Sequence, residues 1–191
     1  LSSSQYKRAL VIGSDQLSSY VDWKDRGSCI LFGDGAGALA IEASTDQSNL
    51  FDYKLRTDGE RGSFLNLYNK KLNGDIIDEI KFRKGEFSNI SMNGQEVYKF
   101  AVREVPIIIS ELLKKLDFDS ADIDWLILHQ ANQRILDAVG ERLKINKDKI
   151  LTNLNKYGNT SAATIPLVLD EFIRNKKIKK NDIILTSGFG A

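Results

Sequence analysis

The feature that most constrains the fold is an alternation of helix-like and strand-like segments along the second half of the chain. From residue 95, apolar residues recur every three or four positions, which predicts an amphipathic helix over about 94–116, interrupted by Pro106. Three short apolar runs and two further helical patterns follow: strands at 124–129, 150–152 and 183–186, and helices around 135–143 and 161–174. Strands that alternate with helices predict an α/β fold with a mostly parallel sheet.

The first part of the chain has a different pattern. Residues 9–13 form an apolar run that ends at a glycine, which predicts a buried strand. The runs 29–32 and 38–42 flank a glycine-rich stretch, which predicts a hairpin or a bulged pair of strands. Residues 51–55 are a further strand candidate, and the polar residues 59–89 predict a long surface excursion.

Composition excludes several classes of protein. The 191 residues are 42% apolar and 28% charged, which is typical of a globular protein and not of a disordered or collagen-like one. The single cysteine excludes an internal disulfide and a zinc cluster, and indicates a reducing compartment. A net charge of +1 gives no electrostatic case for nucleic acid, and no apolar run approaches the roughly 20 residues of a membrane span.

Both ends of the chain are unusual. The chain starts at Leu1 without a methionine, and it stops at Ala191 in a glycine-rich turn just after an apolar strand. We interpret it as a fragment cut at both ends.

The only histidine, His129, directly follows an apolar strand and precedes a helix. In open α/β sheets, ligands bind at that edge. A lone histidine there is commonly a structural group. However, residues 129–134 (His-Gln-Ala-Asn-Gln-Arg) gather several polar side chains in one turn, which a strand that merely ends does not require.

A second polar turn, residues 157–163 (Tyr-Gly-Asn-Thr-Ser-Ala-Ala), lies between a strand and a helix one unit later. A plain turn in which Thr160 or Ser161 caps the helix is one interpretation. The other is that Asn159 lies at the same sheet edge as His129. A neutral imidazole and an amide both donate hydrogen bonds, so the pair is suited to stabilise negative charge on a thioester or carbonyl oxygen.

Three other features give weaker signals. Cys29 is the only candidate for a thiol nucleophile, but no helix begins there to lower its pKa, which favours a buried core thiol. The glycine-rich residues 33–37 lack the Gly-Lys-Ser/Thr ending of a phosphate loop, which favours close backbone approach. The lysines between residues 176 and 180 are typical of a solvated helix end rather than a contact with an acidic partner.

Five motifs occur in a fixed order: Asp25-Arg26-Gly27, residues 32–38 (Phe-Gly-Asp-Gly-Ala-Gly-Ala), residues 92–99 (Met-Asn-Gly-Gln-Glu-Val-Tyr-Lys), residues 129–135 (His-Gln-Ala-Asn-Gln-Arg-Ile) and residues 157–163. Together they resemble the β-ketoacyl-acyl carrier protein synthase III family of condensing enzymes. The resemblance covers nearly the whole chain, and the ordered pair His-Gln-Ala-Asn and Gly-Asn-Thr-Ser is its most specific part.

The resemblance implies a thiolase-like layered α/β fold, here incomplete, with two similar halves and normally a homodimer. Residues 1–48 would be the tail of the N-terminal half, and residues 49–191 would be the C-terminal half without its last residues. The implied reaction transfers an acyl group from acyl-coenzyme A to a cysteine and condenses it with malonyl-acyl carrier protein, with loss of carbon dioxide, to initiate fatty acid synthesis.

The resemblance also implies the cofactors, partners and location of the protein. It implies no metal and no cofactor, the acyl carrier protein and a coenzyme A thioester as partners, and neither nucleic acid nor membrane. The implied location is the cytoplasm, or the stroma in a plastid-bearing organism.

Site residues follow from the resemblance position by position. His129 and Asn159 match the catalytic pair, which would hold the malonyl thioester oxygen as an enolate forms. The positions that match the coenzyme A path and the acyl pocket are Arg26, Gly27, Met92, Gly94, Asn132 and Phe189. Lys99 and Arg134 match basic positions that dock the carrier protein.

The departures from the family pattern concern the nucleophile above all. The family's cysteine falls before Leu1 and Cys29 is not that residue, so this polypeptide alone is expected to be inactive. Glu141 stands where some members carry a lysine, and residues 68–88 look longer than usual. Two alternatives stay open: a sister condensing enzyme with another starter or extender acyl group, and a catalytically silent thiolase-like binding partner.

Overall fold

The computed structural model describes residues 1, 5–44, 50–68 and 87–190. Its strands and α-helices, in chain order, are β1 (Arg8–Gln16), β2 (Asp34–Glu42), β3 (Leu65–Asn66), β4 (Ser91–Met92), α1 (Gly94–Lys115), β5 (Trp125–Leu128), α2 (Gln133–Leu143), α3 (Leu154–Tyr157), α4 (Thr164–Arg174) and β6 (Ile184–Ser187).

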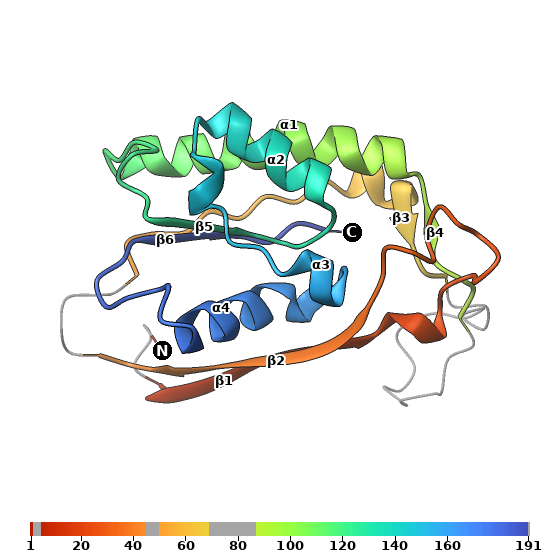
Figure 1. Ribbon diagram of the computed structural model, residues 1–191, viewed down its shortest axis with the longest axis horizontal. Helices are drawn as coiled ribbons and strands as arrows, with labels where there is room; N and C mark the ends of the chain where they lie inside the picture. Colours follow the sequence, from red (N-terminus) through yellow and green to blue (C-terminus); the bar gives the residue numbers. More distant parts are fainter. Residues whose placement is uncertain (2–4, 45–49, 69–86, 191) are drawn as a thin grey trace.

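These elements are stacked in layers (Figure 1). Helices α1 and α2 pack together on one side of the β5–β6 pair, and α3 and α4 lie on the other side. The antiparallel β1–β2 ribbon covers the far side of α4. Strands β5 and β6 are parallel, with Leu126 opposite Leu185, and the predicted layered α/β fold is confirmed. The β1–β2 and β3–β4 pairs are antiparallel, so the strands of the described residues are not mostly parallel as predicted.

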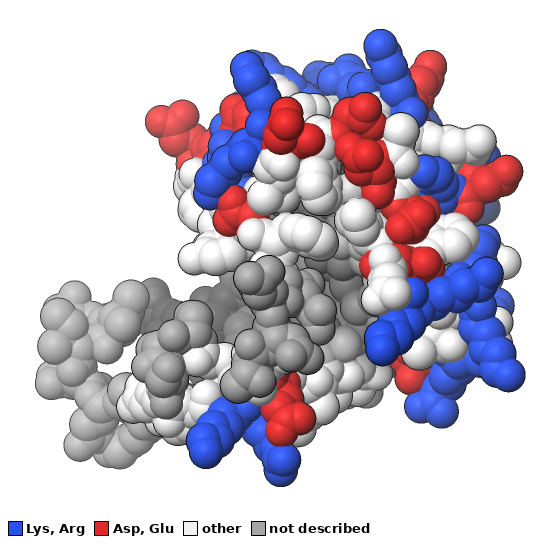
Figure 2. Space-filling view, turned by 90° about the vertical axis from the view of Figure 1, so that its left-hand side faces the viewer, with Lys and Arg blue, Asp and Glu red and all other residues white. Residues whose placement is uncertain are grey.

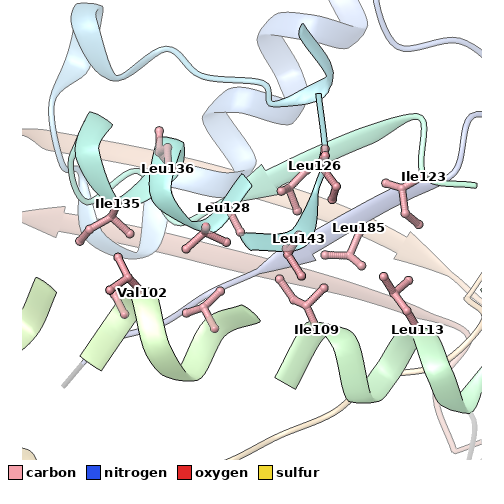
Figure 3. Packing of buried hydrophobic residues seen from close by; sticks show 14 residues of the cluster. Val102, Ile109, Leu113, Ile123, Leu126, Leu128, Ile135, Leu136, Leu143 and Leu185 are labelled. Carbon is pink, nitrogen blue, oxygen red and sulfur yellow. The ribbon is translucent and has the colours of Figure 1, made fainter. Parts of the chain in front are cut away.

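The core explains why β5 is continuously apolar. Side chains alternate between the two faces of a strand. Leu126 and Leu128 therefore belong to the cluster beneath α1 and α2, whereas Ile127 packs with Val168 of α4 on the opposite face. Figure 3 shows Val102, Ile109 and Leu113 of α1 directed toward the leucines of β5 and β6. Both faces of β5 are buried, so every position on it must be apolar.

The long helix α1 has sequence signals at both ends. The Asn93 side chain accepts a hydrogen bond from Glu96 N at 3.3 Å, which caps the N-terminus. Lys114 and Lys115 lie in the last turn, where the helix dipole favours positive charge. The helix predicted over 94–116 is confirmed, with buried Pro106 inside it.

The glycine-rich hairpin predicted at residues 33–37 is wrong. Residues 34–42 form one continuous strand, β2, and Arg8 to Gln16 of β1 pair with Glu42 to Asp34 of it. Residues 29–31 belong to a turn. The strand predicted at 9–13 forms, but it is not buried, since Leu10 is 62% and Ile12 63% exposed.

Two other local predictions are corrected, and two fall outside the described residues. Residues 51–55 form no strand; ion pairs to α1, including Lys115–Asp52 at 2.5 Å and Lys54–Glu111, hold that segment instead. Residues 150–152 contribute only a single parallel bridge, between Ile150 and Leu126. Residues 69–86 of the predicted surface excursion, and the predicted domain boundary at 48/49, lie outside the described residues.

The turn before α4 also differs from its predicted form. Neither Thr160 nor Ser161 caps the helix with its side chain, because a 3-10 turn, Ser161–Ala163, comes first and α4 begins at Thr164. The backbone N–H groups of this turn have other acceptors. Ala162 N donates to Asp15 Oδ2 of β1 at 3.1 Å, so the turn is tied to the ribbon beneath it.

Glycine is required where this turn meets the ribbon. Gly33 N donates to Asn159 O at 2.8 Å, and Asn159 N donates to Leu31 O at 2.9 Å. A Cβ atom at Gly33 would lie 2.2 Å from the backbone oxygen of Tyr157. The glycine-rich run therefore permits close backbone approach, as the sequence indicated.

We expect Gly33→Ala in the full-length protein to lower the free energy of unfolding by about 1–3 kcal/mol, because the backbone oxygen cannot yield without moving the Asn159 loop. Chemical denaturation measures the change. Gly59→Ala is the matched control, since a Cβ there meets nothing within 4 Å. Equal effects of the two substitutions would contradict the close-contact argument.

Candidate active site

His129 is held from three sides at the end of β5. Its backbone N–H donates to Ser187 O at 2.8 Å, which continues the β5–β6 ladder by one residue. Its Nδ1 lies 2.8 Å from Oγ1 of Thr164, the first residue of α4. The ring also packs edge-to-face against Phe189, with centroids 5.1 Å apart and an interplanar angle of 85°. The imidazole is therefore fixed in place and orientation.

The surroundings of His129 keep its ring neutral. Burial disfavours the charged imidazolium and lowers the pKa of His129 from 6.5 to about 4. At neutral pH the side chain consequently carries one ring proton, and it offers one donor and one acceptor nitrogen.

Asn159 is fixed by its own backbone and by the next turn. Gly158 adopts a positive φ of 69°, and Ser161 a positive φ of 51°, which folds the loop tightly around Asn159. Asn159 Oδ1 accepts a hydrogen bond from Ser161 N at 2.9 Å. Because a backbone N–H only donates, the oxygen must face Ser161, and the Nδ2 amino group with its two donors faces away from it.

His129 and Asn159 line one cavity of about 420 Å³, together with Phe189. Most of its remaining wall is apolar, with Phe32, Leu65 and Ile90 among the lining residues. The structure thus brings together two donor side chains from loops 30 residues apart in the sequence, in surroundings where few other groups compete for their hydrogen bonds. Such an arrangement is suited to bind an oxygen that acquires negative charge.

The other predicted site residues lie outside this cavity. Arg26 and Gly27 belong to the turn before β2, and Gly27 N donates to Asp25 Oδ1 at 2.9 Å. Met92 ends β4 and Gly94 begins α1. The Asn132 side chain caps α2 by accepting from Ile135 N at 3.0 Å.

The two predicted docking residues lie on the N-terminal turns of neighbouring helices. Lys99 of α1 pairs with Glu96 at 2.6 Å. The Arg134 guanidinium of α2 lies over the Tyr98 ring of α1, 5.2 Å from its centroid. This contact joins the beginnings of α1 and α2 and holds Arg134 close to the residue next to Lys99.

Two supporting residues were missed by sequence reasoning. Gln130 is fully buried; its Nε2 donates to Leu128 O at 2.7 Å, and its Oε1 accepts from Thr152 Oγ1 at 2.7 Å. This network ties the turn that carries His129 to the segment that leads to Asn159. Thr164, which contacts His129, has only one signal in the sequence: it follows the Gly-Asn-Thr-Ser motif by three residues.

A second cavity is larger, about 760 Å³, but it does not contain the polar pair. It lies between residues 50–56, α1 and β6, and its wall is largely aliphatic and aromatic. Cys29 lines neither of the two cavities. The smaller cavity is therefore the one that both donor side chains line.

The charged side chains of the described surface are of both signs. On the face shown in Figure 2, basic and acidic side chains lie next to one another, in keeping with a net charge of +1. Within the described ranges, no cluster of three or more His, Cys, Asp or Glu is arranged to hold a metal ion. No helix in the described part of the chain is both long and apolar enough to cross a bilayer.

Two family models match the chain. The model described as 3-oxoacyl-[acyl-carrier-protein (ACP)] synthase III C terminal matches residues 113–191, and the model described as 3-oxoacyl-[acyl-carrier-protein (ACP)] synthase III matches residues 1–59. The two matches leave out the segment between them, which includes β3, β4 and most of α1.

The chain is also similar to individual proteins and to solved structures. The chain is 71% identical to a beta-ketoacyl-[acyl-carrier-protein] synthase III of Prochlorococcus marinus strain MIT 9515, over 100% of the chain and 57% of that protein. It is similar to the crystal structures of 3-oxoacyl-[acyl-carrier-protein] synthase III from Aquifex aeolicus VF5 (37% identity, TM-score 0.86, 100% of this chain, 56% of that one) and of the Thermus thermophilus synthase III (34%, 0.86, 100% and 57%). The chain spans about 57% of the length of two of the curated relatives that it matches.

We expect His129 to titrate far below the ordinary range, with a pKa near 4 in the full-length protein. Nuclear magnetic resonance of the ring, assigned with a His129→Gln variant, measures the midpoint. Between pH 6.5 and 4 the unfolded chain binds a proton that the folded chain does not, so the stability from this residue falls as the pH falls through that window. A midpoint near 6.5 would contradict the burial of the ring.

Proposed function

Because the chain belongs to the 3-oxoacyl-[acyl-carrier-protein] synthase III family, we propose that the complete protein joins an acyl group from acyl-coenzyme A to malonyl-acyl carrier protein. The products are a β-ketoacyl-acyl carrier protein and carbon dioxide, and the reaction initiates fatty acid synthesis. The observation that carries the proposal is the shared cavity of His129 and Asn159.

The two side chains act on the malonyl thioester. When the carboxylate leaves as carbon dioxide, the electron pair of the broken C–C bond passes to the thioester, whose carbonyl oxygen becomes an enolate oxygen. The Asn159 amino group and one His129 ring N–H donate to that oxygen. The enolate carbon then attacks the carbonyl of the acyl-enzyme, and the thiolate leaves.

The state of each donor supports this role. Asn159 is turned by its bond from Ser161 N so that its amino group is the free end of the amide. His129 is neutral because burial lowers its pKa to about 4, so it donates without releasing a full proton to the enolate. Both groups are held before substrate arrives, which is the condition under which such donors lower a barrier most.

The remaining residues are proposed to guide the substrates. Phe189 borders both cavities and stands beside His129, in a position suited to an acyl chain. Coenzyme A would contact two segments: the turn with Arg26 and Gly27, and the β4–α1 junction with Met92 and Gly94. Asn132, at the start of α2, would add to the pantetheine path.

Carrier-protein docking is proposed at the beginnings of α1 and α2. Lys99 and Arg134 are exposed there, and acyl carrier proteins are recognised through their acidic surface, which two cations on adjacent helix ends complement. No cofactor takes part in the proposed reaction. The single cysteine fits a reducing compartment, and we propose the cytoplasm.

A homodimer is part of the proposal for the complete protein. Leu10, Val11 and Ile12 of β1 are more than half exposed in this chain. Apolar side chains that are contiguous along a strand favour burial against more protein, either the rest of the complete chain or a second copy.

We expect His129→Ala and Asn159→Ala in the full-length enzyme each to slow malonyl decarboxylation by about 10²–10³-fold, because each removes one donor to the enolate oxygen. Transfer of the acyl group to the cysteine should be largely retained, which radiolabelled acyl-coenzyme A measures. Asn155→Ala is the matched control, since Asn155 is exposed on α3 and lines neither described cavity. Normal decarboxylation in both active-site variants would remove the assignment.

We expect Arg134→Ala to raise the KM for malonyl-acyl carrier protein by about three- to tenfold, and to weaken the salt dependence of that KM, because a cation at a docking rim acts mainly on association. Steady-state kinetics at two ionic strengths measure both effects. Arg174→Ala, an exposed arginine at the far end of α4, is the control. The docking assignment fails if the two variants behave alike.

A further inference from the structure

The hydroxyl group of Thr164 has two neighbours and one hydrogen to donate. Its Oγ1 lies 2.8 Å from His129 Nδ1 and 2.9 Å from Ser161 O. If the hydrogen goes to Ser161 O, Oγ1 accepts from Nδ1–H of the imidazole. If it goes to Nδ1, that nitrogen is the acceptor and the ring proton is on Nε2. The choice decides which tautomer His129 adopts.

The backbone of the same turn permits the second arrangement. Ser161 O already accepts a hydrogen bond from the backbone N–H of Thr164, so it does not depend on the hydroxyl. The proposed function requires the ring proton on Nε2, and Nδ1 of such a ring needs a donor. The Thr164 hydroxyl, 2.8 Å away, is in place to supply it. Thr164 is 2% exposed, so water does not readily replace it.

We propose that Thr164 is a positioning residue, which donates its hydroxyl hydrogen to His129 Nδ1 and thereby keeps the ring proton on Nε2, the nitrogen that remains for the substrate. This inference rests on the proposed function, in which His129 must donate to the enolate oxygen. The opposite tautomer would turn a lone pair toward that oxygen and repel the developing charge.

The position of the hydroxyl is itself determined by the β1–β2 ribbon. Thr164 follows the 3-10 turn Ser161–Ala163, and Ala162 N in that turn donates to Asp15 Oδ2 of β1. Asn159 Oδ1 accepts from Ser161 N in the same turn. One turn therefore orients both donors, Asn159 directly and His129 through Thr164.

Three substitutions of Thr164 in the full-length enzyme separate the possibilities. Thr164→Val keeps the shape and removes the donor, Thr164→Ser keeps the donor, and Thr164→Asp replaces it with an acceptor that draws the proton to Nδ1. Thr186→Val, on β6, is the control, because Thr186 is exposed and does not line the His129 cavity. Thermal unfolding selects the variants that are folded.

The readouts are malonyl decarboxylation and the ¹⁵N chemical shifts of the His129 ring, which distinguish a protonated nitrogen from an unprotonated one. We expect the ring proton on Nε2 both in the unsubstituted enzyme and in Thr164→Ser. The decarboxylation rates of these two enzymes should agree within about twofold. Thr164→Val should lose about tenfold, and Thr164→Asp about 100-fold with the proton moved to Nδ1, since a wrongly oriented histidine tautomer is severely impaired in catalysis.

Two results would overturn the inference: Nδ1–H in the unsubstituted enzyme, or an unchanged tautomer and rate in both Thr164→Val and Thr164→Asp. The ring shifts are measured without substrate, so they test the tautomer even if His129→Ala decarboxylates normally. In that case the proposed function fails, and the ring shifts alone decide whether Thr164 sets the tautomer.

Discussion

The contact between the Gly158–Ala163 loop and the β1–β2 ribbon is the constraint on which the candidate site depends. Backbone hydrogen bonds from Gly33 N to Asn159 O and from Asn159 N to Leu31 O join two segments more than 120 residues apart. They form only because Gly33 has no Cβ to meet the Tyr157 backbone. The ribbon thus supplies no catalytic side chain, yet it sets the position from which Asn159 and the start of α4 reach the cavity. The position of the donor pair therefore depends on the glycines of the ribbon.

Preorganisation connects this packing with the proposed chemistry. For each donor, the polar atom that does not meet substrate has a fixed partner: Ser161 N for Asn159 Oδ1, and Thr164 Oγ1 for His129 Nδ1. The buried hydrogen bond between Gln130 and Thr152 connects the turn that carries His129 with the segment that leads to Asn159. Little reorganisation then remains for the moment at which charge develops on the enolate oxygen. In a cavity with mostly apolar walls, that charge has few other sources of stabilisation. The orientation of the His129 ring and the Asn159 amide therefore strongly affects how well the charge is stabilised.

The sequence predicted elements whose signal is local. Helix α1 repeats its apolar face over six turns and has Asn93 before it, and β5 is apolar at every position because both its faces are buried. Elements that depend on distant partners were not predictable in this way. Residues 51–55 are apolar enough for a strand, but Lys54 and Asp52 bind carboxylate and ammonium groups of α1 about 60 residues away. The glycines at 33–37 are typical of a turn, and only the packed Asn159 loop explains why they lie in a strand.

The same distinction separates the predicted and the missed parts of the site. His129 and Asn159 were found because each follows a strand, and strand ends gather at one edge of the sheet. Thr164 was missed because the helix was expected to begin at Ser161, which would place Thr164 one turn inside it. The left-handed φ of 51° at Ser161 delays the helix by three residues, so that Thr164 becomes its first residue and its hydroxyl faces His129. No local propensity favours that conformation for a serine. The Ala162–Asp15 bond and the Asn159–Ser161 bond hold it from either side, so the backbone strain at Ser161 is what permits one turn to orient both donors.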